Sequence, residues 1–232
     1  MIKPGIDTFE QWNEEHALKH DLDKFYCHPN RLFRYIENKR ISILIEKADI
    51  KCEHNVLEVG CGAGHILERI KTGILTGIDI SAVQIDRAKK RIGEKAVLIK
   101  AKGEELPFSD NTFDRVICTE VFEHVLEPEL LLKEINRVLK NDGIFSLSVP
   151  NENLIILTKK ILLNLGLKKV LEPKESKWDL ASKNNLDEWH LHKYSINLIK
   201  KQVKNYFKIN SVNRIPFFFL PYRYVLKLTK LQ

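Results

Sequence analysis

The strongest constraint on the fold is a regular alternation of short apolar runs and amphipathic segments that begins near residue 55. The apolar runs predict strands at residues 56–59, 74–80, 96–100, 113–118 and 144–149. The segments between them predict helices at residues 65–71, 81–91 and 129–139. Strands that alternate with helices form a mostly parallel sheet with helices on both faces. The sequence therefore predicts an α/β fold.

Outside this region the pattern predicts further helices and two late strands. The helices are expected at residues 9–24, 30–49, 153–165 and 195–205, and the strands at residues 207–214 and 223–228. Ser81 and Ser195 are expected N-caps, because a serine hydroxyl accepts a hydrogen bond from a free amide of the first helical turn. Residues 141–143, Asn-Asp-Gly, predict a turn before the strand at residues 144–149.

Composition excludes several classes of protein. With 44% hydrophobic and 30% charged residues over 232 positions, the chain suits a globular domain rather than a disordered protein. The four cysteines contain no C-x-x-C pair, which argues against a disulfide scaffold and against a cysteine zinc site. No apolar stretch approaches the roughly 20 residues that span a bilayer, and the N-terminus lacks a signal-peptide core. We therefore expect a cytoplasmic protein with reduced thiols.

The net charge of +7 is unevenly distributed along the chain. Residues 189–232 hold 9 Lys and Arg residues and no Asp or Glu, and they include an aromatic segment at residues 215–226. Three interpretations stay open for this segment. It is a patch that contacts a membrane surface or a lipid, a surface for nucleic acid, or only the last two strands with lysines in solvent. Nucleic acid is not the expected partner, because residues 1–150 carry a slight acidic excess.

A glycine-rich turn separates the first expected strand from the first helix. Gly60, Gly62 and Gly64 stand in the pattern G-x-G-x-G, whereas the dinucleotide fingerprint has G-x-G-x-x-G, so a pyrophosphate loop fits poorly. Asp79 lies near the end of the second expected strand, at a spacing where an acidic side chain accepts hydrogen bonds from both hydroxyls of a ribose. Turn and acid together predict a nucleoside-binding site.

Five blocks of sequence carry a resemblance to a known family. They are residues 56–64, 77–81, 103–108, 113–118 and 137–143. In this order they resemble the class I S-adenosylmethionine (SAM)-dependent methyltransferases, within them the methyltransferase type 11 and ubiquinone-pathway enzymes. The resemblance implies SAM as the cofactor and a Rossmann-like, seven-stranded, mostly parallel sheet whose last strand runs antiparallel.

The resemblance also assigns residues to the cofactor. They are Glu58, Gly60, Cys61, Gly62, Asp79, Ile80, Gly103, Glu104, Thr119 and Glu120. The turn would line the methionine part of SAM, with the carboxylate of Glu58 supporting its amino group. Asp79 would hold the ribose and Ile80 would pack on the adenine, with the block at residues 103–104 at the adenine edge. Residues 119–120 would face the methyl-donor side.

Three histidines are candidates for proton transfer from the methyl acceptor: His124, His190 and His192. Histidine is the usual base near neutral pH. His124 ends the pattern E-x-x-E-H, which is similar to that of two metal-using branches of the family, the ubiquinone-pathway O-methyltransferases and the small-RNA 2′-O-methyltransferases. By that resemblance Glu120, Glu123 and His124 would bind Mg²⁺ or another divalent ion, and either His190 or His192 would complete the site. The alternatives are a general base without a metal and a histidine that only packs, and a metal is not the favoured interpretation.

The resemblance divides the single domain into four parts. We expect an N-terminal helical extension or lid (1–54) in which Tyr26 is a candidate lid residue, a SAM-binding core (55–150), an insertion forming an acceptor lid (151–194), and a C-terminal helix with the last two strands (195–232). The expected activity is methyl transfer to an oxygen or nitrogen of a small molecule. Alternatives are a lipid- or isoprenoid-linked acceptor, metal-assisted RNA 2′-O-methylation, and a non-catalytic subunit with the SAM fold. The sequence indicates neither the acceptor nor the oligomeric state.

Overall fold

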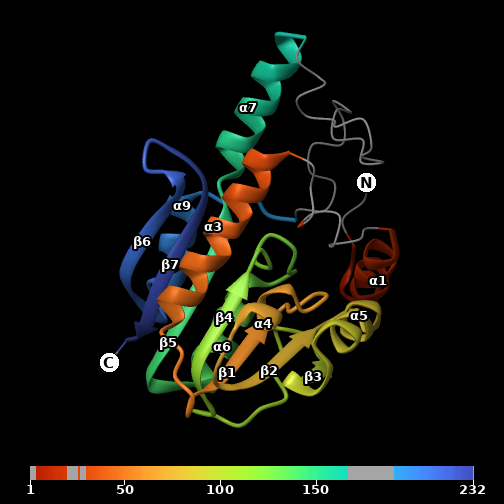
Figure 1. Cartoon of the computed structure of the whole chain (residues 1–232), viewed down its shortest axis with the longest axis vertical. Coiled ribbons are helices and arrows are strands. Elements are labelled where there is room, and N and C mark those ends of the chain that lie inside the picture. Colours follow the sequence, from red (N-terminus) through yellow and green to blue (C-terminus); the bar gives the residue numbers. More distant parts are fainter. Residues whose placement is uncertain (1–3, 20–25, 27–29, 167–190, 232) are drawn as a thin grey trace.

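A seven-stranded sheet forms the centre of the molecule (Figure 1). The structure is a computed structural model that describes residues 4–19, 26, 30–166 and 191–231. The strands are β1 (Asn55–Val59), β2 (Ile74–Asp79), β3 (Ala96–Lys100), β4 (Phe113–Thr119), β5 (Leu139–Pro150), β6 (Phe207–Phe217) and β7 (Leu220–Lys230). They are arranged in the order β3-β2-β1-β4-β5-β7-β6. β1 to β5 are parallel, and β7 runs antiparallel between β5 and β6. The predicted Rossmann-like fold with an antiparallel last strand is confirmed.

The helices lie close to where the sequence predicts them. They are α1 (Phe9–Lys19), α3 (Arg31–Ala48), α4 (His65–Arg69), α5 (Ala82–Ile92), α6 (Pro128–Val138), α7 (Glu152–Asn164) and α9 (Ile196–Val203), with short 3₁₀ turns at Ile6–Thr8 and Gly93–Lys95. Both predicted serine N-caps are confirmed. The hydroxyl of Ser81 accepts from the amide of Gln84 at 3.2 Å, and that of Ser195 accepts from the amide of Leu198 at 3.3 Å.

Each face of the sheet has its own apolar core. Successive side chains of a strand point to opposite faces, so Val116 and Cys118 of β4 pack on one side and Ile117 on the other. The first core includes residues of α6 and α9, and the second includes residues of α3, α4 and α5. The sheet is therefore the middle of three layers (Figure 1).

The predicted turn at residues 141–143 is wrong in one respect. These residues lie within β5, where the pairing with β4 shifts register between Phe113 opposite Leu139 and Arg115 opposite Ile144. The extra residues of β5 bulge out of the ladder at this point. A β-carbon on Gly143 would lie 2.6 Å from the side chain of Leu139. Gly143 is therefore a position inside β5 where the chain passes close to Leu139, and it does not belong to a turn before the strand.

Gly77 of β2 lets α4 approach the sheet closely. A β-carbon at this position would lie 2.6 Å from Leu67 Cδ1 of α4, 3.0 Å from Leu98 Cδ2 and 3.1 Å from Cys61 Cβ. Atoms in real structures do not approach a β-carbon at the shortest of these distances, so a larger residue would push α4 away. The helix carries the glycine-rich turn at its N-terminus, and Gly77 therefore helps to place that turn.

We expect Gly77→Ala to lower the free energy of unfolding by about 1–3 kcal/mol, because it overpacks a closed interface. Urea denaturation followed by circular dichroism measures the change. Gly5→Ala is the matched control, since a β-carbon there has no neighbour within 4 Å, and it should change stability by less than about 0.5 kcal/mol. Equal stability of the two variants would contradict the close packing of α4.

Candidate functional site

The glycine-rich turn after β1 has a backbone that other residues rarely adopt. Gly60, Gly62 and Gly64 have φ values of 72°, 49° and 80°, in the left-handed region that favours glycine. At Gly60 a β-carbon would also lie 2.3 Å from Val121 Cγ2. The amides of Gly60 and Cys61 both donate to the carbonyl oxygen of Ile78, at 2.9 and 2.8 Å. The turn is thus held at the carboxyl end of β2.

Asp79 joins this turn to the start of α5. Its Oδ2 accepts from the amide of Gly62 at 2.8 Å, and its Oδ1 accepts from the amide of Ser81 at 2.9 Å. Burial raises the pKa of the Asp79 carboxyl to about 6, although these amides act in the opposite direction. The amide of Ile80 is a further donor to this carboxylate, which has about four acceptor sites. The glycine-rich turn and Asp79 therefore lie in direct contact, and the carboxylate retains acceptor capacity.

Glu58 is the second carboxyl group of this region. It is buried in β1, and its pKa lies well above the ordinary value because of burial and the nearby charge of Asp79. The amide of Leu67 is a donor to it, while Oε2 has no hydrogen-bond partner among the described residues. An unsatisfied buried acceptor is compatible with a cationic amino group as its partner. The carboxyl groups of Glu58 and Asp79 therefore offer acceptors that fit the amino group and the hydroxyls of SAM. Their roles in binding SAM remain predictions.

The other predicted cofactor residues lie around this turn but contribute unequally. The side chain of Cys61 is buried in the core under α4, and burial raises the pKa of its thiol well above the usual range. Cys61 therefore offers its backbone rather than its sulfur. Gly103 lies close to Leu131 and Val59, where a β-carbon would lie 2.8 Å and 3.2 Å from their side chains. Ile80 lies half-buried between Asp79 and the cap of α5.

Glu104, which is predicted to lie at the adenine edge, has two backbone partners in the loop after β4. Its carboxylate accepts from the backbone amides of Leu126 and Glu127, and burial raises its pKa. The side chain thus connects the segment after β3 to the loop after β4. Its predicted role with adenine stays a prediction, and these two amides already engage the carboxylate.

Arg40 of α3 is a buried charge that the sequence analysis did not identify. Only 1% of it is exposed, and its Nε lies 2.8 Å from Glu37 Oε2. Its Nη1 donates to the hydroxyl of Thr119 and, at 3.1 Å, to that of Ser148. The guanidinium therefore ties α3 to the carboxyl ends of β4 and β5. The available signal was a pair of opposite charges at i and i+3 within the apolar stripe of an amphipathic helix.

Glu120 continues this network toward β7. It has a φ of 52°, Oε1 accepts from the hydroxyl of Ser148 at 2.9 Å, and Oε2 lies 3.0 Å from Nε of Arg223. Nη2 of Arg223 in turn lies 3.3 Å from Glu37 Oε1. The buried Arg40 and the partly exposed Arg223 are therefore balanced by two glutamates, as charges removed from water require. We call Glu37, Arg40, Glu120 and Arg223 the buried ion network.

The segment at residues 191–195 packs against the loop that follows β4. The amides of Leu191 and His192 donate to the carbonyl oxygen of Glu123 at 2.7 and 3.3 Å. Nε2 of His192 lies 2.9 Å from the carbonyl oxygen of Val125, and it must donate because that partner can only accept. The other ring nitrogen, Nδ1, is then the acceptor of a neutral imidazole. His192 and the loop of His124 are thus brought together, while His190 lies outside the described residues.

No group of three or more metal-ligating side chains comes together in the part of the chain that the structure describes. In the predicted set, the carboxylate of Glu120 pairs with Arg223, and Glu123 is buried.

Within the same described ranges, no helix has both the length and the apolar character needed to cross a membrane.

Comparisons with known proteins give the context for this site. The model of a family described as "Methyltransferase domain" matches residues 57–147. YrhH of Bacillus subtilis, a protein classed among the methyltransferases, is 31% identical over 56% of this chain and 73% of its own. The ubiquinone biosynthesis O-methyltransferase of Coxiella burnetii is 30% identical over 60% of this chain and 63% of its own. The chain spans about half the length of other curated relatives, such as an uncharacterised protein of Methanocaldococcus jannaschii.

Solved structures show the same fold at low sequence identity. Magnesium protoporphyrin IX methyltransferase from Synechocystis, solved with bound S-adenosylhomocysteine (SAH), has a TM-score of 0.67 and 16% identity. The match covers 96% of this chain and 100% of that one. Together with the family model, the curated relatives and the glycine turn beside an acidic residue, this shows that the chain belongs to the class I SAM-dependent methyltransferases.

Proposed function

We propose that this protein transfers the methyl group of SAM to an oxygen or nitrogen atom of a small-molecule acceptor. The observation that carries the proposal is the contact between Gly62 and Asp79, which joins the glycine turn to a carboxylate with free acceptor capacity. When bound, the cofactor supplies a methyl group on a positively charged sulfur, so the protein contributes mainly position and electrostatics. Asp79 accepts from the ribose hydroxyls, Ile80 packs on the adenine, and Glu58 attracts the amino group.

The acceptor side would be formed by the loop after β4 and the segment at residues 191–195. An acceptor hydroxyl or ammonium group has to lose a proton, and the free Nδ1 of His192 is a candidate to take it. His124, in the loop after β4, is the second candidate for this role. The buried ion network holds Glu120 beside this region, with its carboxylate 3.0 Å from Nε of Arg223.

An apolar or lipid-linked acceptor is a second candidate for the substrate. One of the relatives is named for ubiquinone biosynthesis, and its acceptor class comes to this chain only as a proposal. An observation on this chain points the same way. The exposed aromatic turn between β6 and β7 lies at the same edge of the sheet as the glycine-rich turn, because β6 runs parallel to β1 through β5.

Turnover tests the activity directly. The purified protein is incubated with radiolabelled SAM and pools of phenols, catechols, amines and quinone precursors, and SAH formation is measured in each pool. We expect SAH formation in at least one pool. Partition of the label between an organic and an aqueous phase distinguishes apolar from polar acceptors. If the protein does not bind SAH by calorimetry, the proposal is wrong.

We expect Asp79→Asn to weaken SAH binding on the order of 100-fold, because two hydrogen bonds to a charged acceptor are lost or weakened. Isothermal titration calorimetry measures the dissociation constant. Asp86→Asn is the matched control, since Asp86 lies exposed on α5 and should leave the affinity unchanged. Thermal melts of both variants show whether they are folded. Equal affinities in two folded variants would contradict the placement of the ribose at Asp79.

The pKa of Asp79 also predicts how binding depends on pH. The hydroxyls of a ribose bind best to the ionised carboxylate, so the proton that Asp79 holds below about pH 6 has to leave. We expect the affinity for SAH to be constant above pH 6 and to fall by up to about tenfold per pH unit below it. The raised pKa has the opposite effect on folding, since this group alone favours the folded chain less as the pH rises from about 4 to 6.

Calorimetry across this pH range measures the effect. Asp79→Asn is the internal control, because its residual affinity should lose most of the pH dependence. A pH profile that is identical in the two proteins would show that another group is responsible.

A further inference from the structure

Large exposed hydrophobic side chains gather on three neighbouring elements. Of the fourteen such side chains in the described part of the chain, nine lie on the N-terminal half of α3, on α7 and at the turn between β6 and β7. They are Leu32, Tyr35, Leu157, Ile161, Leu165, Phe217, Phe218, Phe219 and Leu220. Scattered exposed apolar residues need no explanation, but a group on adjoining elements marks an interaction surface. We call this group the apolar rim.

The turn between β6 and β7 is the most exposed part of the apolar rim. Phe218 is 77% exposed and Phe219 is 68% exposed. The rings of Phe217 and Phe219 stack with centroids 5.4 Å apart, and Phe218 meets Phe219 edge-on at 5.3 Å. The aromatic rings are therefore arranged against one another while remaining open to solvent.

The three elements are tied together by side chains. Nζ of Lys39 in α3 donates to the carbonyl oxygen of Pro216 at 2.9 Å and lies 5.8 Å from the ring centroid of Phe217. On the other side, the hydroxyl of Thr158 in α7 lies 3.0 Å from that of Tyr222 in β7. The aromatic turn therefore contacts α3, and β7 next to the turn contacts α7.

Among the residues that the structure describes, the exposed charged side chains beside the apolar rim are basic. Arg31 and Arg214 are exposed beside it, and Lys160 is exposed on α7. The acidic residues of α3 near this end and of α7 are Glu37 and Glu152, and both are buried. Residues 206–231 contain no acidic residue. Exposed aromatic residues ringed by basic ones match the surface of an anionic bilayer, where the rings enter the headgroup region.

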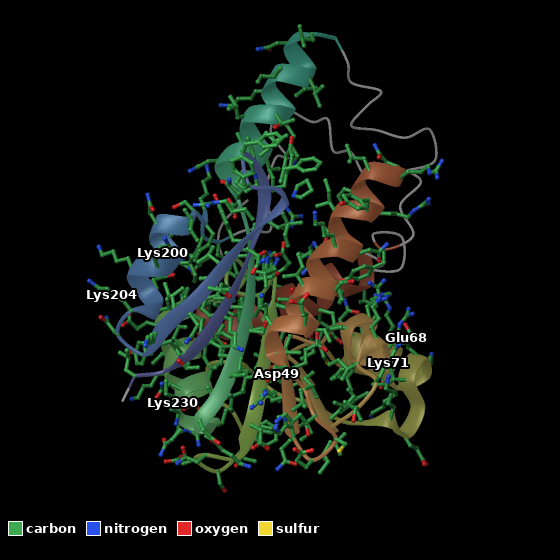
Figure 2. All side chains as sticks on the ribbon, turned by 60° about the vertical axis from the view of Figure 1, so that its left-hand side comes forward. Asp49, Glu68, Lys71, Lys200, Lys204 and Lys230 are labelled. Carbon is green, nitrogen blue, oxygen red and sulfur yellow. The ribbon has the colours of Figure 1, made fainter. Side chains whose placement is uncertain are left out.

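Only part of the basic C-terminal tail takes part in this surface. Lys200 and Lys204 lie on α9 and Lys230 at the end of β7, and Figure 2 shows them grouped away from the turn between β6 and β7. The kind of partner that fits this surface therefore does not depend on the net positive charge of the whole tail. It depends on the local combination of Phe217–Phe219 with the exposed basic residues Arg31, Arg214 and Lys160.

From these observations we propose that the apolar rim binds the surface of an anionic lipid bilayer, with Phe218 and Phe219 entering the headgroup region. The strand directions place this surface at the edge of the sheet that carries the glycine turn and Glu120, so the site would face the membrane. The binding surface itself does not depend on the proposed methyl transfer.

Vesicle co-sedimentation of the full chain tests the proposal. We expect binding to mixed phosphatidylglycerol–phosphatidylcholine vesicles at low salt, and weaker binding to phosphatidylcholine alone or at high salt. Phe218→Ser/Phe219→Ser should lower the partition coefficient at least about tenfold. Arg31→Gln/Arg214→Gln should lower it severalfold for anionic vesicles only. The matched control is Ile74→Thr/Val97→Thr, two residues that are each 60% exposed outside the apolar rim, and it should bind as the native chain does.

Three results would overturn the proposal. The first is a native chain that stays in the supernatant with anionic vesicles at low salt. The second is a folded Phe218→Ser/Phe219→Ser variant that binds as well as the native chain. The third is a dimer, detected by analytical ultracentrifugation, that this variant dissociates while neither protein binds vesicles, because a second copy of the chain would then be the occupant. SAH affinity, measured in parallel, should be the same in all these variants, so failure here is distinguishable from failure of the proposed activity.

Discussion

The geometry of the proposed acceptor side depends on the contacts that the buried guanidinium of Arg40 makes with its partners. A charge this deep in a protein is tolerated only when it is paired and hydrogen-bonded, and Arg40 meets this need with Glu37 and the hydroxyls of Thr119 and Ser148. These partners come from α3, β4 and β5, so the three elements have one relative arrangement that satisfies the charge. Glu120, held by Ser148 and Arg223, takes its position from the same arrangement.

The two halves of the site are built by different means. The proposed cofactor half consists of backbone at a glycine turn plus two carboxylates, so its form is fixed by φ angles and by short-range contacts such as Gly62 with Asp79. The proposed acceptor half would consist of side chains from α3, β4, β5, β7 and the segment at residues 191–195. Backbone geometry suits a cofactor shared by a whole family, whereas side chains can differ between relatives that methylate different acceptors.

This difference explains how much could be predicted from the sequence. The glycine spacing and the acid after β2 are local patterns, and the contact of Gly62 with Asp79 spans only 17 residues. The partners of Arg40 lie 79 and 108 residues along the chain, so no local pattern could reveal them. Glu104 shows the same limit. The local pattern around it indicates the cofactor site, but it does not reveal the contact of its carboxylate with the loop at residues 126–127. The sequence predicts a turn where β5 bulges, because Asn, Asp and Gly all favour turns.

The place of the apolar rim follows from topology rather than from composition. Because β7 is inserted antiparallel between β5 and β6, the turn that joins β6 to β7 has to lie at the edge where β1 through β5 end. A parallel strand in place of β7 would instead have needed a crossover connection that runs from this edge of the sheet to the opposite one. The same antiparallel strand brings Arg223 to Glu37 and Glu120. One hairpin therefore completes the buried ion network with its stem and exposes Phe218 and Phe219 at its turn, so the proposed acceptor side and the proposed membrane-binding surface would belong to one structural unit.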